Sequence, residues 1–135
     1  MYNDATAKDR KWKNLDNLKN ALEQDNSEDE SDKVEKACDI ICKNYNTRLK
    51  EEDVARAIRI SASHLRLLLK KNLGKNFTTL LHEYRIEAAK HLIINEGQTF
   101  SEIALRVGFE TPAFFFKLFK RHTGMTPKEY AKSLG

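Results

Sequence analysis

The sequence predicts an all-α fold in which helices alternate with short turns. In residues 101–130 the apolar positions follow helical spacing that is interrupted at glycines. A weaker copy of this pattern lies 49 to 50 residues earlier in the chain. Between the two copies, residues 77–95 form one long periodic segment that Gly97 closes. The chain is therefore expected to contain two similar helical units joined by a linker helix.

Residues 101–130 predict a helix, a tight turn, a second helix, another turn and a last helix. Ser101 and Thr111 are expected to cap the first two helices, because a hydroxyl oxygen can accept a hydrogen bond from a free N–H of the first turn. Gly108 and Gly124 end them, since glycine adopts positive φ at little cost. The residues expected to be buried are Ile103, Ala104, Val107, Phe109, Phe115, Leu118 and Phe119.

The earlier copy matches this segment position by position. A shift of 49 residues relates Val54, Ala55, Ile58 and Ile60 to Ile103, Ala104, Val107 and Phe109. After the turn, a shift of 50 relates Leu65, Leu68, Leu69, Lys70 and Gly74 to Phe115, Leu118, Phe119, Lys120 and Gly124. The second copy should therefore carry one extra residue in or next to its turn. Arg59 occupies the place of Gly108, so a non-glycine residue is expected at an unfavourable backbone angle.

The second copy also carries a specific run of spaced residues, namely Gly108, Phe109, Phe115, Phe119, Lys120, Gly124, Thr126, Pro127 and Tyr130. This run resembles the signature of AraC-type transcription regulators. Residues 85–93, RIEAAKHLI, resemble the element that joins the two units in that family. The resemblance implies a DNA-binding domain of about seven helices with two helix-turn-helix subdomains.

We expect two parts in the chain. Residues 1–32 form an N-terminal extension, with a candidate short helix at Trp12, Leu15, Leu18 and Leu22 and an acidic, flexible linker at residues 25–32. Residues 33–135 form the AraC-type DNA-binding domain. Within it we expect the first helix-turn-helix at about 51–71, the linker helix at about 77–95, the second helix-turn-helix at about 101–122 and the last helix at about 126–134.

The charge distribution favours a polyanionic partner. Residues 1–32 contain five Lys and Arg against nine Asp and Glu, whereas residues 33–135 contain nineteen against eleven. No apolar run approaches the roughly 20 residues that cross a bilayer, and the N-terminus lacks the apolar core of a signal peptide. We therefore expect a cytoplasmic protein with no membrane partner.

Catalytic and metal sites are not expected. The four histidines form no Ser-His-Asp or Cys-His pattern, and the glycines separate helices instead of forming a phosphate loop. Cys38 and Cys42 are spaced as half of a metal site, but no second ligand pair follows them. The favoured interpretation is two reduced thiols in or near a core, with no cofactor, no metal and no enzymatic activity.

The second helix of each unit offers an exposed face that fits a major groove. The base-facing candidates are Ser63, Arg66, Leu67, Ala113, Phe116 and Lys117. The phosphate-binding candidates are Lys70, Lys71, Thr111, Lys120 and Arg121. Arg66 is the best candidate for reading guanine. Leu67 has two interpretations, contact with a thymine methyl group or packing against another part of the protein.

The expected function is sequence-specific binding of double-stranded DNA to regulate transcription. Residues 77–95 as one helix would be about 28 Å long, close to one DNA turn of about 34 Å, so two recognition helices could enter successive major grooves. We expect a monomer on DNA, with dimerisation left open, RNA polymerase as a candidate partner, and activation as the working interpretation. The alternative is a protein–protein interaction module that uses the N-terminal apolar stripe together with exposed Leu67 and Phe116.

Overall fold

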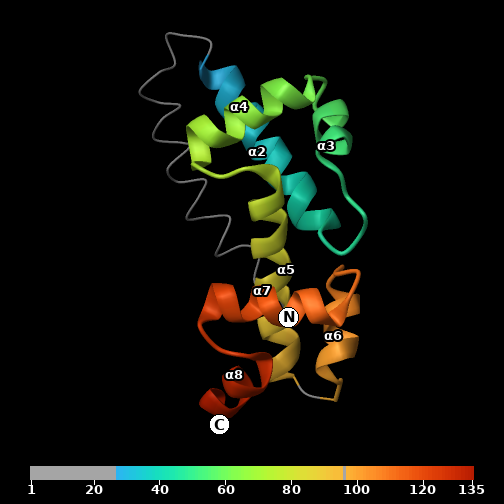
Figure 1. Cartoon of the computed structure of the whole chain (residues 1–135). Helices are drawn as coiled ribbons and strands as arrows, with labels where there is room; N and C mark the ends of the chain where they lie inside the picture. Colours follow the sequence, from blue (N-terminus) through green and yellow to red (C-terminus); the bar gives the residue numbers. More distant parts are fainter. Residues whose placement is uncertain (1–26, 96) are drawn as a thin grey trace. The chain divides into compact units, whose positions relative to one another are not determined.

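The computed structural model describes residues 27–95 and 97–135, and within them the fold is all-α, as predicted. The described residues contain seven helices (Figure 1): α2 (Ser27–Asn44), α3 (Glu51–Ala57), α4 (Ala62–Leu73), α5 (Phe77–Ile94), α6 (Phe100–Arg106), α7 (Pro112–Thr123) and α8 (Pro127–Leu134). The apolar stripe at Trp12, Leu15, Leu18 and Leu22 lies outside the described residues. None of the described helices is both long enough and apolar enough to cross a bilayer.

The helices fall into two compact units. The first unit consists of α2, α3, α4 and the start of α5 as far as Leu81. The second unit consists of residues 45–48, the remainder of α5 from His82, and α6, α7 and α8. Each unit therefore contains one predicted helix-turn-helix, and α5 contributes residues to both.

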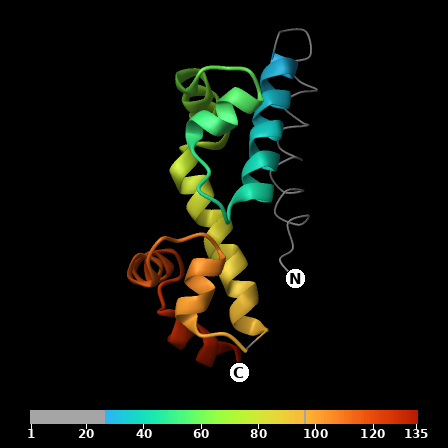
Figure 2. The ribbon, with the colours of Figure 1, turned by 90° about the vertical axis from the view of Figure 1, so that its right-hand side faces the viewer.

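In the first unit, α2 packs against both α3 and α4, and its continuous course can be followed in Figure 2. The residues buried in this unit are Val34, Ala37, Cys38, Ile41, Cys42, Val54, Ala55, Leu65, Leu68, Leu69, Phe77, Leu80 and Leu81. Both cysteines are buried thiols, in agreement with the favoured interpretation. Among the described residues no three His, Cys, Asp or Glu side chains form a group that could hold a metal ion.

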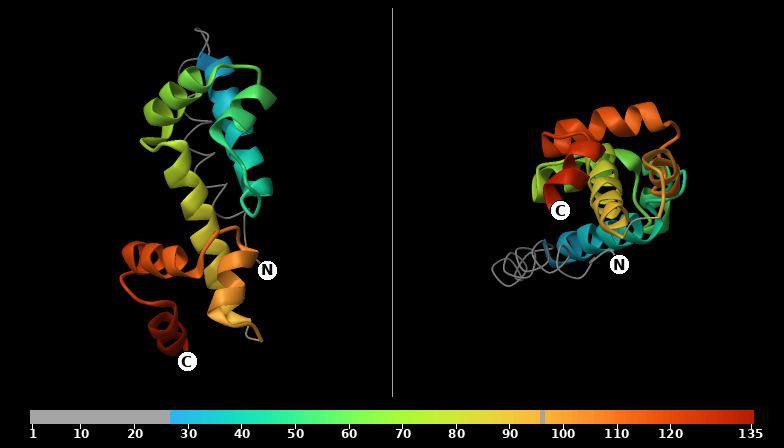
Figure 3. Two further views of the ribbon diagram at one scale, coloured as in Figure 1. Left: turned by 45° about the vertical axis from the view of Figure 1, so that its right-hand side comes forward. Right: turned by 90° about the horizontal axis from the view of Figure 1, so that it is seen from below.

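In the second unit, α6 and α7 pack on the α5 residues of that unit (Figure 3). A chain of aromatic rings runs through its centre. Phe115 lies 5.5 Å from Phe109 and 5.6 Å from Phe119, and Phe119 lies 5.5 Å from Tyr130 of α8, all between ring centroids. Such tilted and edge-on pairs add to the gain from burial. The predicted buried positions of α6 and α7 are therefore the core of this unit.

The two helix-turn-helix turns have matching backbone hydrogen bonds. Ile60 N donates to Ala55 O at 3.0 Å, and Phe109 N donates to Ala104 O at the same distance. One residue earlier, Arg59 has a φ of 62° and Gly108 a φ of 108°. The structure thus confirms that Arg59 adopts the left-handed backbone angle expected at a glycine position.

The extra residue of the second turn is Glu110. In the first unit the capping residue Ser61 follows Ile60 directly, whereas in the second unit Glu110 separates Phe109 from the capping residue Thr111. Beyond this insertion the two units match again, and the helices end in the same way. Gly74 and Gly124 both adopt positive φ and donate to the carbonyls of the lysines four residues earlier.

Two expectations about helix starts are wrong. Thr99, not Ser101, caps α6: the Thr99 hydroxyl accepts from Glu102 N at 3.1 Å, and the Glu102 carboxylate accepts from Thr99 N at 2.8 Å. This reciprocal pair satisfies two backbone donors, which Ser101 could not do because Ala104 stands three residues after it.

The segment expected to be a flexible acidic linker is helical from Ser27 onward and forms the start of α2. Acidic residues suit this end of a helix because the N-terminus carries partial positive charge. Asp32 also pairs with Lys36 one turn later, with 3.1 Å between Oδ2 and Nζ. Local composition therefore favours the helix here instead of opposing it.

Candidate nucleic-acid interface

Helix α4 buries one side in the first unit and exposes the other. Ser61 caps its start by accepting from His64 N at 3.0 Å, and Leu65, Leu68 and Leu69 are buried. All predicted contact residues of this helix are exposed, namely Ser63, Arg66, Leu67, Lys70 and Lys71. Leu67 is 69% exposed, so it does not pack against the described part of the chain.

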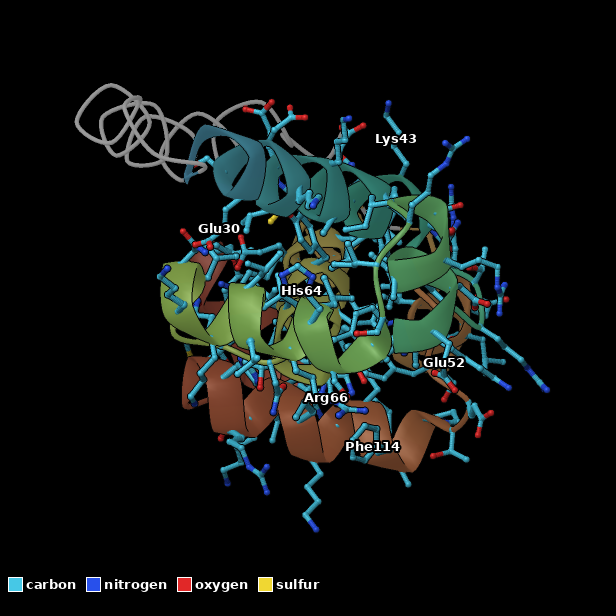
Figure 4. All side chains as sticks on the ribbon, turned by 90° about the horizontal axis from the view of Figure 1, so that it is seen from above. Glu30, Lys43, Glu52, His64, Arg66 and Phe114 are labelled. Carbon is cyan, nitrogen blue, oxygen red and sulfur yellow. The ribbon has the colours of Figure 1, made fainter. Side chains whose placement is uncertain are left out.

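Two of the exposed cations of α4 are paired with carboxylates from other helices. Arg66 lies on the side of α4 that faces away from α2 (Figure 4), and its Nε is 2.9 Å from Oε1 of Glu51 in α3. Lys71 Nζ is 3.2 Å from Oε1 of Glu30 in α2, and Asn72 also donates to Glu30. The predicted base reader and one predicted phosphate contact are thus already engaged by acidic groups.

Helix α7, like α4, buries one side in its unit and exposes the other. Thr111 caps it by accepting from Phe114 N at 3.2 Å, and Pro112 occupies the first turn, as predicted. The predicted contact residues Thr111, Ala113, Phe116, Lys117, Lys120 and Arg121 are all exposed. Neither α4 nor α7 contains Asp or Glu, and both carry cations in the last turn. Both faces are therefore suited to a polyanion.

The exposed faces of α4 and α7 occupy equivalent positions in their units but carry their residues in a different order. With the 50-residue shift, Arg66 corresponds to Phe116 and Leu67 to Lys117. Each helix thus presents one cation and one large apolar side chain at this point, exchanged between neighbouring positions. Neighbouring positions point about 100° apart around a helix, so the two faces present different surfaces.

The start of α7 is supported by a cluster that sequence reasoning missed. Phe114 is 44% exposed, and its ring lies 5.5 Å from the His82 ring and 5.9 Å from the Phe109 ring. With Arg85, Glu110 and Thr111, the two phenylalanines line a pocket of about 280 Å³. The sequence signal was the run of three phenylalanines at 114–116, of which only the middle one fits the buried stripe.

Arg85 organises the backbone beneath this cluster. Its Nε donates to Tyr45 O at 2.7 Å and its Nη2 to Thr47 O at 2.9 Å, and its guanidinium lies 5.5 Å from the centre of the Phe109 ring. Burial lowers the pKa of Arg85, which nearby Glu110 partly opposes. Burial also lowers the pKa of His82, with smaller contributions of the same sign from Arg85 and His122. These effects favour the neutral form of the His82 ring, which packs against the rings of Phe109 and Phe114.

A family model described as a helix-turn-helix domain matches residues 54–133. The chain is 36% identical over 97 residues to the lactose operon transcription activator of Staphylococcus xylosus, a match that covers 72% of this chain and 35% of the activator. The chain spans about a third or less of the length of the curated relatives that it matches first. These relatives are named as regulators of transcription, the class of protein that the sequence predicted.

Solved structures show the same fold. The C-terminal domain of AraT, a response regulator from Geobacillus stearothermophilus, is 32% identical with a TM-score of 0.71, over 75% of this chain and 84% of that one. A transcriptional regulator from Chromobacterium violaceum, described by its AraC-type DNA-binding domain, is 25% identical with a TM-score of 0.71, over 74% of this chain and 89% of that one. The chain therefore belongs to the AraC-type family of helix-turn-helix DNA-binding transcription regulators.

Proposed function

We propose that the chain binds double-stranded DNA at a specific sequence by placing α4 and α7 in successive major grooves, and that it activates transcription. The observation that carries the proposal is the repeated helix with an exposed, acid-free face behind the same turn in both units. The length of α5 supports the groove spacing, because 18 residues at about 1.5 Å each give about 27 Å. The activating role follows the lactose operon activator that the chain resembles.

The proposed division of labour separates anchoring from reading. The phosphate contacts are Lys70, Lys71, Thr111, Lys120 and Arg121, which give an affinity that falls with salt. The base-facing residues are Ser63, Arg66, Leu67, Ala113, Phe116 and Lys117. In α4, Arg66 supplies paired donors for guanine and Leu67 an apolar contact for a thymine methyl group. In α7 the face has fewer hydrogen-bonding groups, so shape and deformability of the DNA contribute more there.

A gel-shift assay at low salt followed by selection from a random DNA pool tests the proposal. We expect retardation at low salt and enrichment of one sequence with two conserved blocks spaced by about one helical turn, 10 to 10.5 base pairs. A selected site with a single conserved block would contradict the use of both helices. Absence of retardation would favour the alternative, a protein–protein interaction module that acts through the N-terminal apolar stripe together with exposed Leu67 and Phe116.

The remaining partners belong to the same proposal. The chain binds its site as a monomer in the cytoplasm and contacts RNA polymerase when bound next to a promoter. Sedimentation of the complex with the selected duplex gives the number of chains per site. Transcription in vitro with purified polymerase, with and without the chain, shows whether the effect is activation.

A further inference from the structure

Glu51 contacts the residue to which the proposed function assigns the reading of guanine. Its Oε1 lies 2.9 Å from Nε of Arg66, across a separation of 15 residues in the chain. The Glu51 side chain is 20% exposed, whereas that of Arg66 is 59% exposed. Glu51 is the first residue of α3 and therefore has a backbone fixed by the helix. The less mobile partner of the pair is thus the carboxylate.

We propose that Glu51 is a positioning residue that orients the guanidinium of Arg66 for base recognition, an inference that rests on the proposed function of α4. A guanidinium carries five N–H donors in one rigid plane. The contact with Glu51 uses Nε, so the two terminal Nη groups remain as the fork that matches O6 and N7 of guanine. The ion pair orders this long side chain before DNA arrives, which reduces the entropy lost on binding.

The folding stability that the Glu51–Arg66 ion pair contributes does not explain why a carboxylate lies beside α4. An ion pair with an exposed partner contributes little to folding. Next to a DNA-binding face a negative charge also repels phosphates and lowers affinity for all sequences. α4 and α7 contain no acidic residue of their own, and the carboxylates that contact the cations of α4 come from other helices, Glu51 at Arg66 and Glu30 at Lys71. Of the two, only Glu51 contacts a residue assigned to base reading, so a gain in base discrimination accounts for its position.

The duplication supports the same interpretation. With the shifts of 49 and 50 residues, Glu51 corresponds to Phe100 and Arg66 to Phe116. The unit that lacks the arginine also lacks the carboxylate. Both members of the pair are replaced by phenylalanine, so the carboxylate accompanies the arginine and is not a fixed part of the helix-turn-helix scaffold.

The test uses the full chain, the selected duplex and its single-base variants. The base pair that Arg66 reads is the one at which Arg66→Ala loses preference. At that base pair we expect Glu51→Gln to reduce the preference about fivefold, part of the discrimination of a bidentate contact. Binding to unrelated DNA stays equal or becomes tighter, because a negative charge has been removed. Glu52→Gln is the matched control: Glu52 is exposed on the next position of α3 (Figure 4), and its loss of charge should leave the preference unchanged.

A double-mutant cycle separates positioning from a structural role. In the Arg66→Ala background, Glu51→Gln should change the preference no further, and the thermal midpoint of Glu51→Gln should stay near that of the parent chain. Glu51→Asp, which keeps the charge but shortens the side chain, should lose part of the preference. If Arg66→Ala loses preference and Glu51→Gln keeps or sharpens it, the positioning role is refuted and the proposed function stands. If Arg66→Ala loses preference at no base pair, the assigned role of Arg66 fails and this inference fails with it.

Discussion

Replacing Gly108 with alanine tests the packing of the second unit most directly. Gly108 has a φ of 108°, and a Cβ added there would lie 2.7 Å from Tyr45 O and 2.9 Å from Arg85 Nε. These two atoms are hydrogen-bonded to each other at 2.7 Å. The added methyl group would therefore press on a charged hydrogen bond as well as require a backbone angle that alanine disfavours.

The expected loss in free energy of unfolding can be assembled from these two effects. The left-handed backbone costs a residue with a Cβ about 1–2 kcal/mol. Displacing a hydrogen bond to a charged group costs about 1.5–3 kcal/mol more, so the sum for Gly108→Ala is about 2.5–5 kcal/mol. Gly124→Ala is the matched control, because its φ is 80° and no atom lies within 4 Å of its added Cβ. It should lose only the backbone term, about 1–2 kcal/mol.

Urea denaturation followed by the helical circular dichroism signal measures both losses. The unfolding midpoint of Gly108→Ala should fall clearly below that of Gly124→Ala. Equal midpoints for the two variants would refute the reasoning, because they would mean that Tyr45 and Arg85 can move away from the added methyl group with no loss in free energy of unfolding.

Three further predictions concern the turn, the DNA contacts and pH. Arg59→Gly should raise the free energy of unfolding by about 0.5–1 kcal/mol in the same urea assay, since relief of the left-handed strain exceeds the entropy cost of glycine. Lys120→Ala should weaken binding to all duplexes and reduce the salt slope by about one ion, whereas Arg66→Ala should relax the choice at one base pair; similar behaviour in a salt titration would contradict this division. The lowered pKa of His82 means that the unfolded chain binds more protons. Its contribution to stability is therefore present above pH 6.5, the ordinary value, and is lost as pH falls through the lowered pKa. His82→Gln should flatten that part of the stability profile.

The core and register of the helix-turn-helix units could be read from the sequence because they depend on local periodicity. The stripe of Phe115, Leu118 and Phe119 is buried as predicted. The change of shift from 49 to 50 residues located the insertion to within the turn where Glu110 lies. The true cap of α6 was also readable, since Thr99 has a glutamate three residues later and Ser101 does not.

The contacts that refine the candidate interface could not be read in this way. Arg66 and Glu51 are 15 residues apart, and Lys71 and Glu30 are 41 apart. Their meeting depends on how α2, α3 and α4 pack, which no local pattern specifies. The start of α2 was missed because a run of acidic residues suggests a solvated linker, whereas in the structure it forms the acidic first turns of a helix.

The cation and the large apolar side chain occupy exchanged neighbouring positions in α4 and α7, and this difference affects the orientation in which the chain would bind DNA. In the proposed complex Arg66 and Leu67 face the bases in one unit, and Phe116 and Lys117 occupy the equivalent positions in the other. A duplex that satisfies both faces must differ between its two blocks, so it cannot be bound equally well when its sequence is reversed. If the proposed function holds, a single bound chain has a defined orientation along the DNA. A protein surface outside the two recognition helices would then face a fixed direction relative to the start of transcription.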